Sequence, residues 1–305
     1  MTRVAAFDCG TNSLRLLVAD LDPETGSATE LVREMRIVRL GQGVDRSGRI
    51  AEAALGRVFG ALEELMAMVR EHDVARLRFC ATSAARDADN AEDFLQGVRE
   101  RVGVEPEVLD GDAEARASFA GAVRSLPPLP EPLMVLDIGG GSTELILGRA
   151  SGEVLRGRSL DIGSVRLNER HLAGDPPTRE QVEAAVADID AALDACEVDP
   201  AEAGAVVGVA GTVTTVAAAV LDLAVYDRSV IHHSVLRPDA IQGAVHHLLA
   251  MTVEERRHLG YMHPGRADVI GAGGLILTRV LARTQVRSLL VSEHDILDGL
   301  AWSLA

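Results

Sequence analysis

The chain has 305 residues, and its 46 acidic and 30 basic side chains give a formal net charge of −16. Every basic residue is arginine, which excludes mechanisms that need a lysine, such as a Walker-A phosphate loop or a Schiff base. The acidic balance argues against nucleic acid or an anionic membrane as a partner. With five Phe, two Tyr and one Trp, a base-stacking surface is not expected either.

The cysteines and the N-terminus indicate a cytoplasmic protein. Cys9, Cys80 and Cys196 are odd in number and lack metal-ligand spacing, which favours a reducing compartment. The chain begins with a short strand that carries Asp8, a pattern unlike a signal peptide. Residues 203–221 carry no charge, but three glycines interrupt them, so we predict a buried strand, loop and helix there and no membrane span.

The first part of the chain alternates predicted strands with predicted helices. Apolar residues at helical spacing between 51 and 71 give the clearest amphipathic helix. In chain order, we predict strands at 4–7, 14–19, 30–38, 77–80 and 106–109, and helices at 51–71, 91–101 and 113–124. The proline-rich stretch 126–132 then predicts a boundary between an N-terminal domain, 1–127, and a C-terminal domain, 128–305.

After the prolines the same sequence of elements begins again. Strands are predicted at 134–136, 145–147, 154–160, 205–209 and 288–291, and helices at 165–171, 179–195, from 212, at 239–249 and at 267–281. A last helix follows the final strand, and its return to the first domain is one option.

One short motif occurs twice. The pattern Asp-x-Gly-x-x-Ser stands at 8–13 and again at 137–142, so all three positions match at one offset, 137 − 8 = 129. Each copy lies between two predicted strands, which excludes a Rossmann fingerprint because that motif opens a helix. The matched copies indicate a tandem duplication of an α/β domain.

Such a turn is suited to binding phosphate. Glycines allow a ligand to approach the backbone, and successive N–H groups with the serine hydroxyl form a concave anion site. An aspartate at the end of the strand can hold Mg²⁺, which takes one or two carboxylates and keeps several waters. A single copy is equally compatible with a plain hairpin turn, but two copies in register favour the phosphate interpretation.

Further motifs connect the chain to a known family. They are 8–13 (DCGTNS), 81–86 (ATSAAR), 111–116 (GDAEAR), 137–144 (DIGGGSTE), 208–212 (GVAGT) and 264–268 (PGRAD). With these runs the chain resembles the Ppx/GppA family of exopolyphosphatases and guanosine pentaphosphate phosphohydrolases, within the actin/hexokinase/Hsp70 superfamily. The resemblance implies two RNase H-like (actin-like ATPase) α/β domains with an interdomain active-site cleft. It also implies a Mg²⁺-dependent hydrolase, with Mn²⁺ as an alternative ion.

The resemblance also implies roles for individual residues. Glu114 would be the catalytic base and Arg86 would contact the scissile phosphate. From the residues alone, Glu114 is more typical of an acid that favours the helix dipole after an Asp112 N-cap. The implied metal ligands are Asp137, Glu144 and Asp8, although Glu144 could instead point into solvent and Asp8 could position water. The phosphate-binding residues would be Gly10, Thr11, Asn12, Ser13, Gly139, Gly140, Gly141, Ser142, Gly211, Thr212 and Arg266.

Several alternatives stay open at this point. Inorganic polyphosphate, in short to medium chains, is the favoured substrate, because the longer relatives carry additional C-terminal helical domains. Guanosine pentaphosphate (pppGpp) is the alternative substrate, which would link the enzyme to the stringent response, and a catalytically weak binding regulator is the second alternative. A homodimer is one option for assembly. Arginines 33, 36, 39, 46 and 49 are compatible with a polyphosphate track but more typical of a solvated surface, and the pairs 232–233 and 246–247 are more typical of surface histidines than of a metal site.

Overall fold

The computed structural model describes residues 1–305 and separates the chain into two α/β units. Unit 1 combines Met1–Gly121 with Ile296–Ala305, and unit 2 contains Ala122–Asp295. The chain therefore passes between the units twice, first within α5 (Gly111–Val123) and again just before α13 (Ile296–Trp302). The first crossing lies several residues before the proline-rich stretch 126–132.

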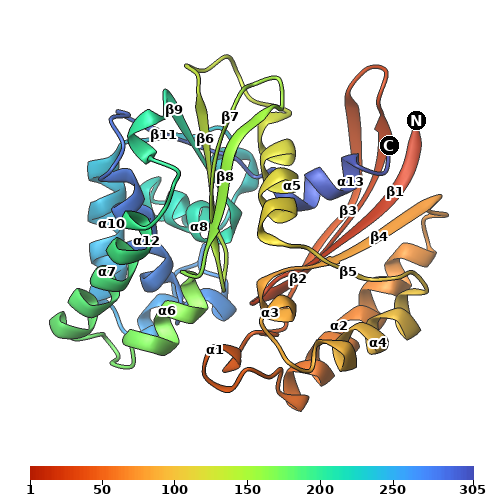
Figure 1. Cartoon of the computed structure of the whole chain (residues 1–305), viewed down its shortest axis with the longest axis horizontal. Coiled ribbons are helices and arrows are strands. Elements are labelled where there is room, and N and C mark those ends of the chain that lie inside the picture. The colour runs from red at the N-terminus through yellow and green to blue at the C-terminus, as the bar shows by residue number, and fades with distance from the viewer. The chain divides into compact units, whose positions relative to one another are not determined.

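Unit 1 is built on a five-stranded sheet in the order β3-β2-β1-β4-β5 (Figure 1). The strands are β1 (Thr2–Cys9), β2 (Ser13–Asp22), β3 (Ser27–Ile37), β4 (Arg76–Ala81) and β5 (Glu107–Val108). The first three form an antiparallel meander, whereas β4 is parallel to β1 and β5 is parallel to β4. The carboxyl ends of β1, β4 and β5 consequently meet at one edge of the sheet.

Helices cover both faces of this sheet. Alternate residues of β1, including Phe7, belong to an apolar cluster with α2 (Glu52–Arg70) and α4 (Ala91–Val102). Val4 and Ala6 point to the opposite face and pack with α13. Burial on both sides explains why β1 is a continuous apolar run and not an alternating one.

Unit 2 repeats this arrangement in a six-stranded sheet of order β10-β11-β9-β6-β7-β8. Its strands are β6 (Leu133–Ile138), β7 (Thr143–Gly148), β8 (Val154–Leu160), β9 (Ala205–Val209), β10 (Val235–Leu236) and β11 (Leu289–Val291). When β10 is left out and the strands of each unit are numbered in chain order, both sheets have the spatial strand order 3-2-1-4-5. The predicted class, α/β with two duplicated domains, is confirmed.

One apolar cluster joins the unit 2 sheet to its helices. The helices that contribute buried residues include α6 (Ser164–His171), α7 (Arg179–Asp194), α8 (Ala210–Val220), α10 (Pro238–Ala250) and α12 (Ile270–Leu281). The uncharged stretch 203–221 forms β9 and α8, as predicted. Across the chain, none of the helices combines the length and the apolar character that a membrane crossing requires.

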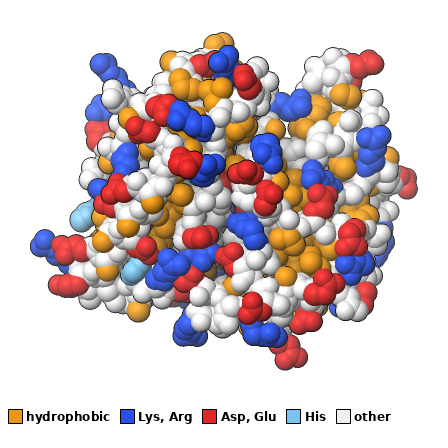
Figure 2. All heavy atoms as spheres, in the orientation of Figure 1, with side chains coloured by type: hydrophobic (Ala, Val, Ile, Leu, Met, Phe, Trp, Pro, Cys, Tyr) orange, Lys and Arg blue, Asp and Glu red, His pale blue; other side chains and the backbone are white.

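The predicted elements are present, and most are longer at one or both ends. The structure adds short elements without a periodic signal: α1 (Val44–Ser47), α3 (Ser83–Arg86), η1 (Pro200–Glu202), α9 (Arg228–Ile231), α11 (Val253–Arg257) and η2 (Pro264–Arg266). Helix α12 begins at Ile270 and not at 267, because the preceding residues form the 3₁₀ turn η2. On the face drawn in Figure 2, arginine and acidic side chains are interspersed.

Glycine at position 299 allows α13 to pack closely against α5. A Cβ at Gly299 would lie 1.9 Å from the carbonyl oxygen of Ala117 and 2.9 Å from its carbonyl carbon. Both are backbone atoms, which cannot move aside as a flexible side chain can. Arg33 on β3 adds an ion pair with Asp298 in α13, so the helix is held by packing and by charge.

We expect Gly299→Ala to destabilise the protein by about 2 kcal/mol, because the added methyl group must push α13 away from α5. The matched control is Gly60→Ala in α2, where a Cβ would meet no atom within 4 Å. This control should be neutral or slightly stabilising, since alanine favours a helix more than glycine does. Urea unfolding of both variants makes the comparison, and equal midpoints would contradict the packing argument.

A charged network connects α7 to α12 in unit 2. Asp190 accepts hydrogen bonds from Arg279 Nε at 2.9 Å and from Arg283 Nη1 at 2.6 Å. Burial raises the pKa of Asp190, but the hydrogen bonds from the two guanidinium groups outweigh it, and the net pKa is lowered. The carboxylate therefore stabilises the fold at pH values above its unfolded pKa of about 4.

Asp190→Asn should cost ~1 kcal/mol of unfolding free energy at pH 7, because the network loses its negative charge. The deficit should shrink as the pH falls through the lowered folded pKa, since the native carboxylate is then protonated as well. Glu183→Gln on the same helix is the control, because its ion pair with Arg179 is exposed. Thermal unfolding from pH 7 to pH 3 measures both, and a deficit independent of pH would refute this account.

Candidate functional site

The first copy of the repeated motif forms a tight turn between β1 and β2, here called loop 1 (residues 10–13). The amide of Gly10 donates to the carbonyl oxygen of Ser13 at 2.9 Å, which closes the turn. The carbonyl of Thr11 accepts from the amide of Gly41, and the carbonyl of Asn12 accepts from the segment that follows β3. Loop 1 is thus held in place through its carbonyl groups.

Asp8 lies at the end of β1 directly before loop 1. The residue is 4% exposed, and its Oδ2 accepts hydrogen bonds from Nη2 and Nε of Arg15 at 2.6 and 2.9 Å. Asp8 and Arg15 are register partners in the antiparallel pair β1–β2, so their side chains project from the same face. No motif in the sequence predicts a role for Arg15.

The end of β4 joins loop 1 at the same edge of the sheet. The amide of Thr82 donates to the carbonyl of Cys9, and the hydroxyl groups of Ser83 and Thr11 lie 2.9 Å apart. Helix α3 begins at Ser83 and ends at Arg86, so it carries Arg86 away from this contact by one turn. Parallel pairing of β1 with β4 is what brings these two sequence motifs together.

Arg86 and Glu114 are in direct contact. Arg86 Nη1 donates to Glu114 Oε2 at 3.0 Å and to the carbonyl oxygen of Leu109 at 2.7 Å. Glu114 is 7% exposed, in the first turn of α5. The expected Asp112 cap is wrong: the helix begins at Gly111, and Asp110 Oδ1 accepts from the amide of Ala113 at 2.7 Å. The predicted catalytic pair is therefore an ion pair between the buried Glu114 and the partly exposed Arg86.

The second motif copy forms the equivalent turn in unit 2, here called loop 2 (residues 139–142). The amide of Gly139 donates to the carbonyl of Ser142 at 3.0 Å, as in loop 1. The carbonyls of Gly139 and Gly140 accept from amides at the start of α6, where a Cβ at Gly163 would lie 2.4 Å from Gly140 O. The amides of Gly140 and Gly141 have no acceptor within the chain and can receive an anion.

Two acidic residues lie on neighbouring strands beside loop 2. Asp137 on β6 and Glu144 on β7 are register partners, and their residues are 7% and 2% exposed. Ser159 Oγ on the neighbouring strand β8 donates to Glu144 Oε1 at 2.7 Å. Glu144 is therefore buried in the sheet and does not point into solvent.

The third predicted phosphate motif lies at the start of α8. A Cβ at Gly211 would lie 2.3 Å from Nη2 of Arg266, so the guanidinium group rests on the glycine backbone. A Cβ at Gly273 would meet the side chains of both Thr212 and Ser164, the first residue of α6. Because α6 also binds the carbonyls of loop 2, these contacts place Thr212 close to loop 2.

The predicted residues form two groups, one in each unit. The unit 1 group contains Asp8, loop 1, Arg86 and Glu114, and the unit 2 group contains Asp137, loop 2, Glu144, Gly211, Thr212 and Arg266. No cluster of three or more His, Cys, Asp or Glu side chains has the arrangement of a metal site. The donor set of Asp137 and Glu144 nevertheless fits Mg²⁺, which takes one or two carboxylates together with water and substrate phosphates.

Other charged residues from the sequence have structural partners. In the arginine-rich stretch, Arg33 pairs with Asp298. Arg36 pairs with Glu64. The ring of His232 stacks on that of His233, with centroids 3.8 Å apart.

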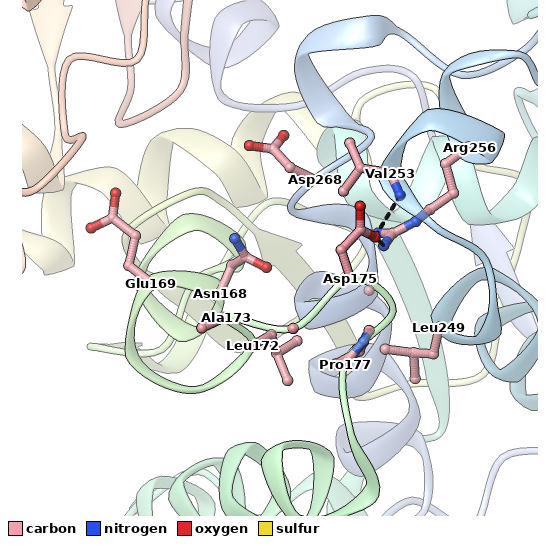
Figure 3. A pocket seen from close by; sticks show the side chains of 12 residues that line it. Asn168, Glu169, Leu172, Ala173, Asp175, Pro177, Leu249, Val253, Arg256 and Asp268 are labelled. Atoms are coloured by element: carbon pink, nitrogen blue, oxygen red, sulfur yellow. Dashed lines mark hydrogen bonds and ion pairs between the residues drawn. The ribbon is translucent and has the colours of Figure 1, made fainter.

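Unit 2 also contains a cavity of about 330 Å³ that the sequence analysis did not anticipate (Figure 3). Its wall includes Arg256, which is 3% exposed and donates to the carbonyl of Ala267 at 2.7 Å. Arg256 also forms an ion pair with Asp175 at 3.8 Å, drawn as a dashed line in Figure 3. None of the predicted site residues lines this cavity.

The chain is similar to known proteins along nearly its whole length. The model of the Ppx/GppA phosphatase family matches residues 17–305. Exopolyphosphatase 2 of Mycobacterium tuberculosis is 43% identical over 318 aligned residues, covering 100% of this chain and 99% of that protein. Two crystal structures are similar throughout. An exopolyphosphatase-like protein has a TM-score of 0.96 at 41% identity, covering 100% of this chain and 98% of its own. An exopolyphosphatase from Cytophaga hutchinsonii has a TM-score of 0.90 at 26% identity, covering 99% and 97%.

The family model spans all but the first 16 residues of the chain, and a named relative matches the chain from end to end. This agreement, together with the two motif loops and the Arg86–Glu114 ion pair, shows that the chain belongs to the Ppx/GppA phosphatase family and is a hydrolase of phosphoric anhydride bonds.

Proposed function

We propose that this enzyme is an exopolyphosphatase, which releases terminal orthophosphate from inorganic polyphosphate. The observation that carries the proposal is the contact between Arg86 and Glu114, 3.0 Å apart at the carboxyl edge of the unit 1 sheet. A carboxylate that can activate water beside a guanidinium that can bind a phosphoryl group suits hydrolysis of an anhydride. The exopolyphosphatase relative that is 43% identical over the whole chain supports the same activity.

Glu114 orients the attacking water and accepts its proton. Its burial limits exchange of that proton with bulk solvent, and its ion pair with Arg86 holds the carboxylate in one orientation. Arg86 offers its remaining N–H groups to the terminal phosphoryl group, where its charge stabilises the transferred oxygens. Turnover therefore depends on the orientation of two side chains.

Each of the two loops carries groups that bind phosphate. The free amides of Gly140 and Gly141 donate to phosphate oxygens at loop 2, with Thr212 and Arg266 close by. Loop 1 offers its backbone and the side chains of Thr11 and Ser13. Asp137 and Glu144 would hold Mg²⁺, which neutralises phosphate charge when it is bound. These groups recognise phosphates, and they suit a polyphosphate substrate even though the net charge of the chain is −16.

Parallel assays test the proposal against its alternatives. Orthophosphate release should be measured from polyphosphates of short, medium and long chain length and from pppGpp, each with and without Mg²⁺. We expect release from polyphosphate that depends on Mg²⁺. Faster release from pppGpp would favour the phosphohydrolase alternative. No release from any substrate, at concentrations where the chain binds them, would leave the regulator as the better interpretation.

Glu114→Gln should lower turnover by about 10²- to 10⁴-fold, because the amide keeps the shape of the side chain but cannot accept a proton. Polyphosphate affinity should change little, since Glu114 acts on water. Glu107→Gln on β5 is the control, because this carboxylate is exposed and pairs with Arg78. Orthophosphate release and a separate binding measurement give both quantities, and turnover within threefold of the native rate would exclude Glu114 as the base.

A further inference from the structure

Loops 1 and 2 share one backbone geometry but differ in one charged position. In each, a glycine amide donates to a serine carbonyl, at 2.9 Å in loop 1 and at 3.0 Å in loop 2. The aspartate before each loop faces a register partner on the next strand. Asp8 faces Arg15, whereas Asp137 faces Glu144, and both pairs occur at the common offset of 129 residues.

The two register pairs therefore differ in their net charge. The Asp8–Arg15 pair sums to zero charge, and its two hydrogen bonds are short enough to be charge-assisted. The Asp137–Glu144 pair carries two acids at directly opposed positions in an antiparallel ladder, where like charges destabilise the sheet. Both acids are more than nine-tenths buried, which raises the free-energy cost of their charge further. A divalent cation bound between the two carboxylates would relieve that cost at loop 2.

We propose that Arg15 is the resident cation of loop 1, and that the chain holds a divalent ion at loop 2 alone. The inference rests on the proposed function, since it assumes that both loops bind phosphate. The guanidinium of Arg15 stays charged at all physiological pH values and cannot dissociate. It supplies at loop 1 the positive charge that loop 2 takes from solution.

This assignment changes the role of Asp8. The expected metal ligand becomes the anchor that holds the Arg15 side chain, through Oδ2, beside the phosphate-binding turn. The duplicated domains then bind phosphate by two different means. Loop 1 uses backbone, hydroxyl groups and a fixed arginine charge, and loop 2 uses backbone amides and a replaceable ion.

The first test counts bound ions without substrate. Mn²⁺ is a suitable probe because it prefers the same carboxylate and water ligands as Mg²⁺ and its free form gives an electron paramagnetic resonance signal. The native chain should bind one Mn²⁺. Asp137→Asn should weaken that binding at least tenfold, whereas Asp8→Asn should change it less than twofold. Zero or two ions on the native chain, or a tenfold loss in D8N, would overturn the proposal.

The second test exchanges the charges between the loops. Arg15→Glu gives loop 1 the charge pattern of loop 2, so the variant should bind two Mn²⁺ ions. Glu144→Arg gives loop 2 the pattern of loop 1 and should bind none. The control is Arg237→Glu, which reverses an exposed charge and should still bind one. Circular dichroism checks that each variant is folded, and where R15E or E144R is not, the comparison of D8N with D137N decides alone.

The outcomes separate this inference from the proposed function. Polyphosphate hydrolysis with a contrary ion count rejects the Arg15 assignment and leaves the activity in place. The expected ion counts without hydrolysis reject the activity and leave the charge asymmetry established. A folded R15E variant that binds a single Mn²⁺ would also show that the charge at position 15 does not determine where the ion binds.

Discussion

The antiparallel register between the first two strands of each unit is the constraint on which both loops depend. It closes each turn through one amide-to-carbonyl hydrogen bond, and it sets which side chain faces the aspartate before the turn. A slip of one residue would send one member of each pair to the opposite face of the sheet. Parallel pairing with β4 and with β9 then brings the next motifs to the same edge. The positions of loop 1, of loop 2 and of the motif at the start of α8 follow from these pairings.

Much of the fold and part of the site were predictable from the sequence, because periodicity and motif spacing are local properties. The helix 52–70 and the two loops follow from apolar spacing and from a repeated turn. The Arg86–Glu114 contact does not follow from such local patterns, since it joins two segments 28 positions apart through the pairing of β4 with β5. The helix cap was assigned to Asp112 and lies at Asp110, because several acids near a helix start give the same signal. The sequence gives no reason to single out Arg15, because its role depends on its hydrogen bonds with Asp8.

In both loops, backbone carbonyl groups accept hydrogen bonds from a neighbouring segment of the chain. Residues after β3 hold loop 1, and the first turn of α6 holds loop 2. A backbone whose carbonyls are engaged in this way directs its amides outward, and it needs little rearrangement when an anion arrives. In the proposed function, this pre-organisation explains how an acidic protein would bind a polyanion, because attraction comes from a few fixed dipoles and charges and not from a positive surface.

The split composition of unit 1 affects how the chain folds during synthesis. Unit 2 is continuous, from Ala122 to Asp295, so it can fold as soon as its own residues have left the ribosome. Unit 1 begins earlier in the sequence but needs residues 296–305, whose helix covers Val4, Ala6 and Leu17 on one face of the sheet. Until that helix emerges, an apolar surface stays exposed in the half that carries Glu114. The first part of the enzyme to be made is therefore the last to be completed.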